Sequence, residues 1–154
     1  MNLTMKTFNK ILLLDDDPVS THFNKYLIDK AGISKIIDVA TSEHEGLSWI
    51  CSNCHVKSTI ECCKEEVLVF PDLTMTAMNR FEFFESMLNL KKNKVIEDLP
   101  HIYFLTSTLA LESDMICGKY PVRGYLNKFL TDDDLNLLLF EQDTDFMVGQ
   151  GNIK

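Results

Sequence analysis

Acidic, hydroxyl and basic side chains recur in this sequence where short apolar segments end. The carboxylates of Asp15, Asp16 and Asp17 follow one such segment, and Asp72, Thr106 and Lys128 stand at or just after the ends of three others. Carboxylates brought close together raise each other's pKa unless a cation joins them. Mg²⁺ prefers oxygen ligands and binds through one or two carboxylates together with phosphate oxygens. The residue types therefore indicate a magnesium site beside a group that handles phosphate.

An aspartate can itself accept a phosphoryl group as an acyl phosphate, a transfer that requires mainly positioning and neutralisation of charge. On this interpretation Asp72 is the nucleophile, and Lys128 and Thr106 neutralise and hydrogen-bond the phosphoryl oxygens. Each residue also has a simpler interpretation, because acidic runs often cap helices, threonines favour strands and single lysines often lie on the surface. Their order on successive strand ends favours the phosphoryl site.

The elements that must bring these residues together are predicted from hydrophobic periodicity. Apolar runs alternate with stretches of helical spacing, which indicates repeated βα units, hence an α/β fold with a parallel sheet covered on both faces. Ligands of such sheets bind outside the carboxyl ends of the strands. The five expected strands are Lys10–Asp15, Lys35–Ala40, Val67–Phe70, Ile102–Thr106 and Val122–Leu126.

Helices are expected between these strands. The first begins at Pro18, is continued at helical spacing by Phe23, Tyr26 and Leu27, and stops at Gly32. The others are a helix opened by a capping box of Ser42 and Glu45, one over Phe81–Leu90, one over Leu109–Cys117, and a last helix capped by Thr131 that buries Leu135, Leu138 and Leu139.

Length and composition indicate one compact domain. The 154 residues are 45% hydrophobic, enough for a core without disulfides. We expect the domain over residues 9–143, with an extension at 1–8, a cysteine-rich loop insertion at 52–66 and a tail at 144–154. A formal charge of −8 argues against direct nucleic-acid binding. The absence of a long apolar run or secretory start predicts a cytoplasmic protein without membrane association.

The cysteine-rich segment offers a separate metal hypothesis. Cys51 and Cys54 have the spacing of zinc ligands, and His55, Cys62 and Cys63 follow nearby. The second half of the cluster lacks a paired spacing, so reduced thiols are the preferred interpretation.

From about Asn9 to Phe140 the sequence resembles the receiver domain of two-component response regulators. The resemblance implies a five-stranded parallel sheet in the order 2-1-3-4-5 with helices on both faces, a flavodoxin-like doubly wound fold, in a stand-alone CheY-like member. The segments that carry it are Ile11–Pro18, Asp72–Met75 with Met78-Asn79 and Phe81–Phe83, Phe104–Ser107 and Val122–Lys128.

The resemblance also implies a function in phosphorelay signal transduction. A histidine kinase or phosphotransfer protein would phosphorylate Asp72, and an unknown downstream protein would read the result. Any enzymatic activity would be limited to Mg²⁺-dependent self-phosphorylation and self-dephosphorylation. The implied residues are Asp15, Asp16, Asp72 and the main-chain carbonyl of Thr74 for Mg²⁺, Lys128 and Thr106 for the phosphoryl group, and Thr106 with Tyr125 for the conformational switch.

Four residues depart from the family pattern: Pro71, Thr76, Arg80 and Phe129. Phe129 replaces the proline that follows the family's lysine through a cis peptide. A cis bond before a residue other than proline costs about 2.5–4 kcal/mol, which leaves open a trans bond and a differently aimed Lys128. These departures support an alternative function, a degenerate receiver that binds a protein partner without being phosphorylated.

Overall fold

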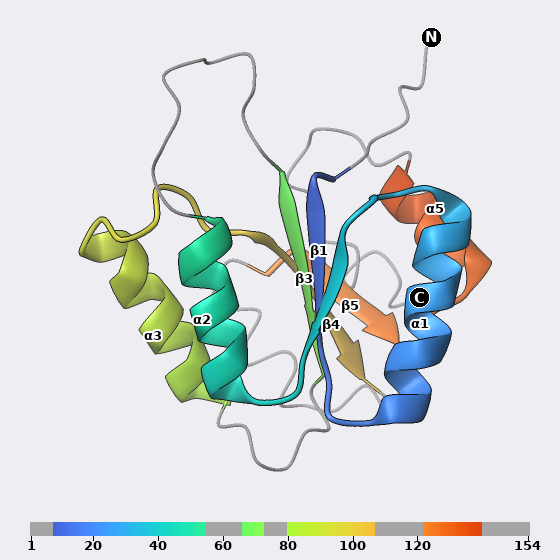
Figure 1. Cartoon of the computed structure of the whole chain (residues 1–154), viewed down its shortest axis with the longest axis horizontal. Coiled ribbons are helices and arrows are strands. Elements are labelled where there is room, and N and C mark those ends of the chain that lie inside the picture. The colour runs from blue at the N-terminus through green and yellow to red at the C-terminus, as the bar shows by residue number, and fades with distance from the viewer. Residues whose placement is uncertain (1–7, 55–65, 73–79, 107–121, 140–154) are drawn as a thin grey trace, which may run out of the picture.

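The computed structural model of the chain describes residues 8–54, 66–72, 80–106 and 122–139. Within them lies a five-stranded parallel sheet in the order β2-β1-β3-β4-β5 (Figure 1), which confirms the predicted fold class and strand order. The strands are β1 (Lys10–Leu14), β2 (Ile37–Ala40), β3 (Val67–Pro71), β4 (His101–Thr106) and β5 (Gly124–Asn127).

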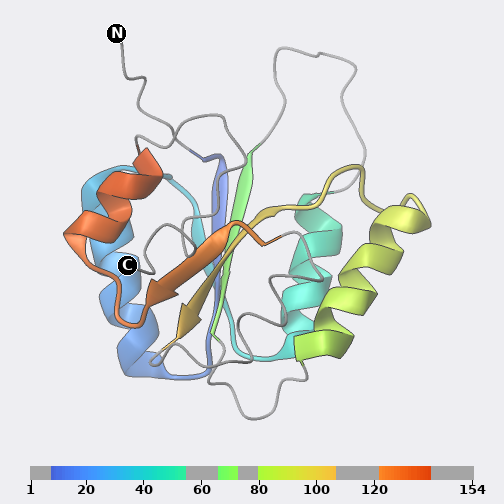
Figure 2. The same ribbon diagram turned by 180° about the vertical axis from the view of Figure 1, so that it is seen from behind.

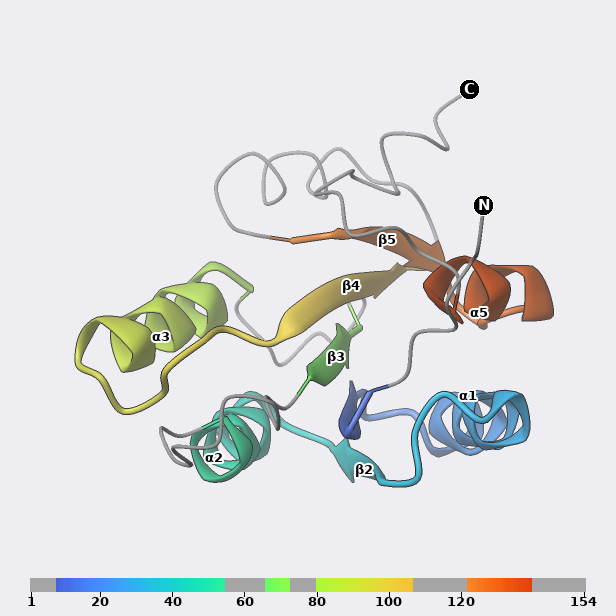
Figure 3. The ribbon, with the colours of Figure 1, turned by 90° about the horizontal axis from the view of Figure 1, so that it is seen from above.

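Helices cover both faces of the sheet. The described helices are α1 (Pro18–Ala31), α2 (Glu43–Asn53), α3 (Arg80–Lys92) and α5 (Asp132–Leu139). Helices α2 and α3 lie on one side and α1 and α5 on the other, as the views from behind and from above show (Figures 2 and 3). None of the helices in these ranges is long and apolar enough to cross a membrane. The helix expected over Leu109–Cys117 lies outside the described residues.

Strand β1 is central to the core and contributes to both sides of it. Leu12 and Leu14 belong to the apolar cluster that includes residues of α2 and α3, whereas Ile11 and Leu13 belong to the cluster that includes residues of α1 and α5. All four side chains are at most 1% exposed. A strand buried on both faces needs a continuous apolar run, which is what the sequence provides.

The buried face of α1 includes polar residues. The helix begins as expected, because Asp17 Oδ1 accepts a hydrogen bond from Val19 N at 3.1 Å, and it ends at Gly32 with a left-handed φ of 72°. Its fully buried residues are Ser20, Asn24 and Ile28. Phe23 and Tyr26, whose helical spacing helped to predict the helix, are 39% and 59% exposed. The inward face of α1 therefore includes two polar residues in addition to Ile28.

The predicted helix caps at Ser42 and Thr131 are confirmed. Glu45 N donates to Ser42 Oγ at 3.1 Å, although the Glu45 carboxylate accepts from Thr41 N rather than from Ser42. Asp134 N donates to Thr131 Oγ1 at 3.1 Å, and Thr131 N donates back to Asp134 Oδ2 at 3.0 Å. Helix α2 continues to Asn53, so the loop starts later than the predicted residue 52.

Pro71 explains an interruption between β3 and β4. The register of the two strands runs from Leu68 opposite His101 to Val69 opposite Ile102, and the pairing returns as an isolated bridge between Asp72 and Leu105. Proline has no N–H to donate to a neighbouring strand. On the other side of β3, Asp72 N still donates to Leu14 O at 2.9 Å, so Asp72 remains fixed to β1.

Candidate functional site

Four predicted site residues meet at the carboxyl edge of the sheet. Backbone hydrogen bonds fix three of them to a neighbouring strand: Asp15 N donates to Ala40 O at 3.0 Å, Asp72 N to Leu14 O at 2.9 Å and Lys128 N to Thr106 O at 2.9 Å. Asp15, Asp72 and Thr106 are 1%, 0% and 2% exposed. Strand pairing therefore fixes the backbone positions from which these side chains extend.

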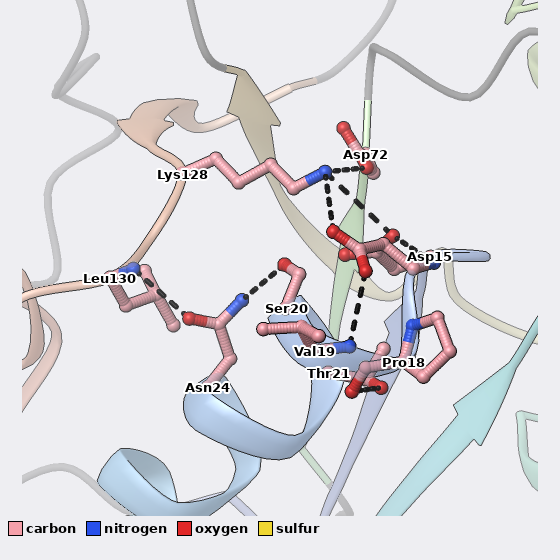
Figure 4. Close-up of polar contacts among 10 residues, drawn as sticks. Asp15, Pro18, Val19, Ser20, Thr21, Asn24, Asp72, Lys128 and Leu130 are labelled. Carbon is pink, nitrogen blue, oxygen red and sulfur yellow. Dashed lines mark hydrogen bonds and ion pairs between the residues drawn. The ribbon is translucent and has the colours of Figure 1, made fainter.

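The ammonium of Lys128 lies among three carboxylates (Figure 4). Lys128 Nζ donates to Asp72 Oδ2 at 2.8 Å and lies 3.9 Å from Asp15 Oδ1 and 4.0 Å from Asp17 Oδ2. The Lys128–Phe129 peptide bond is cis, so the trans alternative is wrong. The ammonium of Lys128 contacts Asp72, the residue expected to accept the phosphoryl group.

Burial and neighbouring charges together shift the pKa values of Asp15 and Lys128. Burial raises the pKa of Asp15 to about 6, and the charge of Asp72 adds to that effect, whereas hydrogen bonding from Asp17 N and the nearby Ser20 hydroxyl oppose it. Burial alone would lower the pKa of Lys128, but its bond to Asp72 and the surrounding carboxylates raise it overall. The raised pKa of Lys128 thus reflects the three carboxylates that surround its ammonium.

Asp15 also has a carboxylate oxygen suited to a cation. Its Oδ1 accepts from Asp17 N at 2.9 Å, but its buried Oδ2 has no hydrogen-bond partner among the described residues. A buried charged oxygen without a partner is costly, and a hard cation would satisfy it. The donor set of Asp15 and Asp72 thus fits Mg²⁺, which commonly takes one or two carboxylates and completes its shell with water and phosphate.

The structure does not test the other two predicted metal ligands, Asp16 and Thr74. Asp16 is exposed, and Thr74 lies outside the described residues. In the described parts of the chain, no group of three His, Cys, Asp or Glu side chains is arranged to hold a metal. The assignment of Asp16 and Thr74 stays a prediction.

The two residues predicted as a switch lie on adjacent strands. Thr106 ends β4, and Tyr125 of β5 is only 7% exposed. The ring of Tyr125 stacks on Phe104 with centroids 5.9 Å apart and an interplanar angle of 13°, and Phe104 makes an edge contact with Phe84 of α3. Tyr125 therefore lies inward in this conformation.

Sequence reasoning missed three polar residues of the site. Asp17 was noted only as part of an acidic run, and the buried positions Ser20 and Asn24 were not considered. Asn24 Oδ1 accepts a hydrogen bond from Leu130 N at 3.0 Å, and Asn24 Nδ2 donates to Ser20 Oγ at 3.4 Å (Figure 4). The available signal was that Ser20, Asn24 and Ile28 follow one another at intervals of four residues, which places all three on one helix face.

The cysteine cluster is described only in part. Cys51 and Cys54 are both of intermediate exposure. His55, Cys62 and Cys63 lie outside the described residues, so the zinc hypothesis stays untested.

Comparison with known proteins identifies the fold. No protein-family model and no curated protein sequence matches the chain. A two-component response regulator from Legionella pneumophila is similar in structure, with a TM-score of 0.65 and 21% identity over 84% of this chain and 94% of that one. Another from Cytophaga hutchinsonii has a TM-score of 0.64 and 20% identity over 86% and 95%. A complex of the P1 domain of CheA3 with CheY6 from R. sphaeroides matches with a TM-score of 0.52 and 18% identity over 79% and 83%.

These matches cover most of the chain and most of each matched chain. The chain therefore has the receiver fold of response regulators, a flavodoxin-like α/β fold. This agrees with the resemblance seen in the sequence.

Proposed function

We propose that the chain is a signalling receiver that accepts a phosphoryl group on Asp72 in a Mg²⁺-dependent reaction. The observation that supports this most directly is the position of Lys128 Nζ, 2.8 Å from the buried Asp72 and 3.9 Å from Asp15. The receiver fold places this cluster at the sheet edge where ligands of such folds bind.

In the proposed reaction a carboxylate oxygen of Asp72 attacks the phosphorus of a phosphorylated histidine on a donor protein. The new P–O bond forms as the donor's P–N bond breaks, and the electron pair of that bond returns to the imidazole. Lys128 moves its hydrogen bond from Asp72 to a phosphoryl oxygen, and the Thr106 hydroxyl donates to another. Asp15 and Asp16 would hold Mg²⁺, which supplies positive charge to the phosphoryl oxygens when bound.

The proposed partners are a histidine kinase or phosphotransfer protein upstream and an unidentified protein downstream. The structural match to a receiver crystallised with a CheA P1 domain supports the first. Thr106 and Tyr125 form the element through which phosphorylation biases a two-state equilibrium, because Thr106 ends β4, the strand next to Asp72, and Tyr125 lies on the following strand of the sheet, β5.

The proposal is tested by incubating the protein with Mg²⁺ and acetyl phosphate and measuring its intact mass. We expect a gain of one phosphoryl group that Asp72→Asn and EDTA abolish and that Asp133→Asn, at an exposed site on α5, retains. No mass gain in the wild-type protein would contradict the proposal and favour the phosphorylation-independent binding module.

A further inference from the structure

We propose that Asn24 is a positioning residue that fixes the segment carrying Lys128 against α1, through the backbone of Leu130, so that the ammonium is held at Asp72. The effect of Asn24 on the rate of phosphorylation rests on the proposed function. Its effect on the position of the Leu130 backbone and the Lys128 side chain does not.

Asn24 is a polar residue at a fully buried position of α1. It is 0% exposed and lies on the buried stripe of α1, where Ile28 one turn later packs in the apolar cluster. A buried amide must find partners, and both ends of this one have them: Oδ1 accepts from Leu130 N at 3.0 Å, and Nδ2 donates to Ser20 Oγ at 3.4 Å. An apolar side chain here would leave the buried N–H of Leu130 without an acceptor.

The bond to Leu130 completes a pair of anchors around Lys128. On one side, Lys128 N donates to Thr106 O at 2.9 Å. On the other, Leu130 is tied to Asn24, and its side chain is 1% exposed within the same apolar cluster as Ile28. Only Phe129 lies between the anchors. The long, flexible stem of Lys128 therefore starts from a backbone that is held on both sides.

The anchor is also tied to the acidic side of the site. Ser20, the second partner of Asn24, lies in the first turns of α1 near Asp15, while Lys128 reaches toward Asp15 and Asp72 from the opposite side (Figure 4). Asn24 thus connects the helix that follows the metal-binding carboxylates to the segment that carries the phosphate-binding cation. A displacement of about 1 Å in such a group can cost a hundredfold in rate.

The first test is structural and requires no phosphorylation. In the Asn24→Ala variant we expect the amide of Leu130 to exchange with deuterium about tenfold faster by NMR. We also expect Lys128, whose side chain is 13% exposed, to acetylate faster with acetic anhydride relative to the exposed Lys25 and Lys30. His22→Ala, at an exposed site on the same helix, is the matched control and should change neither rate.

The second test is kinetic. At saturating Mg²⁺, we expect Asn24→Ala to lower the rate of phosphorylation by acetyl phosphate about ten- to a hundredfold. Asn24→Asp keeps an acceptor for Leu130 N and should retain the amide protection and most of the rate. A rate that Asn24→Asp retains and Asn24→Ala loses would separate a positioning role from loss of the fold. Alanine favours helix more than asparagine does, so Asn24→Ala does not weaken α1 itself.

The two proposals fail in different ways. Unchanged Leu130 exchange and Lys128 labelling in Asn24→Ala would overturn the anchoring role whether or not the protein is phosphorylated. A wild-type protein that gains no phosphoryl group would overturn the proposed function, while the exchange and labelling rates would still decide the anchor. If the wild-type and Asn24→Ala proteins were phosphorylated at equal rates, only the present inference would be overturned.

Discussion

At the scale of the residue, Asp15 carries the clearest electrostatic signature of the site. Its carboxyl group is 1% exposed, and burial followed by the charge of Asp72 raises its pKa to about 6 from an ordinary 3.8. The folded protein therefore holds this proton more tightly than the unfolded chain does. The stability that results is fully present below pH 3.8 and is lost as the pH rises through about 6.

Replacing Asp15 with asparagine should remove this pH dependence. In EDTA, we expect Asp15→Asn to match the wild-type protein near pH 4 and to be more stable at pH 7. The difference should be about 1–3 kcal/mol, since each pKa unit corresponds to about 1.4 kcal/mol. The measurement is the free energy of unfolding in urea at both pH values. A variant that is less stable than the wild-type protein at pH 7 would contradict the assigned origin of the shift.

At the scale of the element, the ends of helices and strands do most of the positioning. Helix α5 begins at Asp132, four residues after Lys128, and its capping box of Thr131 and Asp134 fixes where the site segment ends. The carboxylates of the first turn also favour the positive end of the helix dipole. The cap and the Asn24 anchor therefore act on the same short segment.

Loss of the α5 cap should be measurable as a loss of stability. We expect Thr131→Ala to lower the free energy of unfolding by about 1 kcal/mol, because Asp134 N loses its acceptor. Thr21→Ala is the control: the Thr21 hydroxyl only donates to Pro18 O within α1, so its loss should change stability by less than about 0.5 kcal/mol. Equal effects of the two substitutions in chemical denaturation would argue against the cap.

At the scale of the whole molecule, the site exists only because the strands meet in one order. Asp15 follows β1, Asp72 follows β3, Thr106 ends β4 and Lys128 follows β5, and these strands are neighbours in the sheet. Two buried carboxylates and one partly buried lysine are brought together by this arrangement. A ligand that binds only this assembled site stabilises the folded state by mass action.

Mg²⁺ should therefore stabilise the folded protein. At a hundred times its dissociation constant, we expect Mg²⁺ to raise the free energy of unfolding of the wild-type protein by about 2.7 kcal/mol. The gain should reverse with EDTA and be largely lost in Asp15→Asn. Thermal unfolding at constant ionic strength measures it. An equal gain in wild type and variant would show that the ion binds elsewhere or acts by screening.

Local sequence patterns were enough to predict the elements of this fold and the residue types of its site. Continuous apolar runs predicted the buried strands, Ser42 and Thr131 predicted two helix starts, and the rule that ligands bind at strand ends indicated Asp15, Asp72, Thr106 and Lys128. The resemblance to receiver domains added the strand order. These features follow from periodicities and capping bonds that span only a few residues.

Contacts between groups that are distant in the sequence could be known only from the folded chain. Chain segments that meet in space bring Lys128 to Asp72 and bond Leu130 to Asn24, 106 residues away in sequence. They also bury the Asp15 oxygen that has no hydrogen-bond partner in the part of the chain that the structure describes. Hydrophobic periodicity gives the face of a helix but not its neighbours. A polar residue on a buried stripe can be assigned a role only when the group that satisfies its hydrogen bond is known.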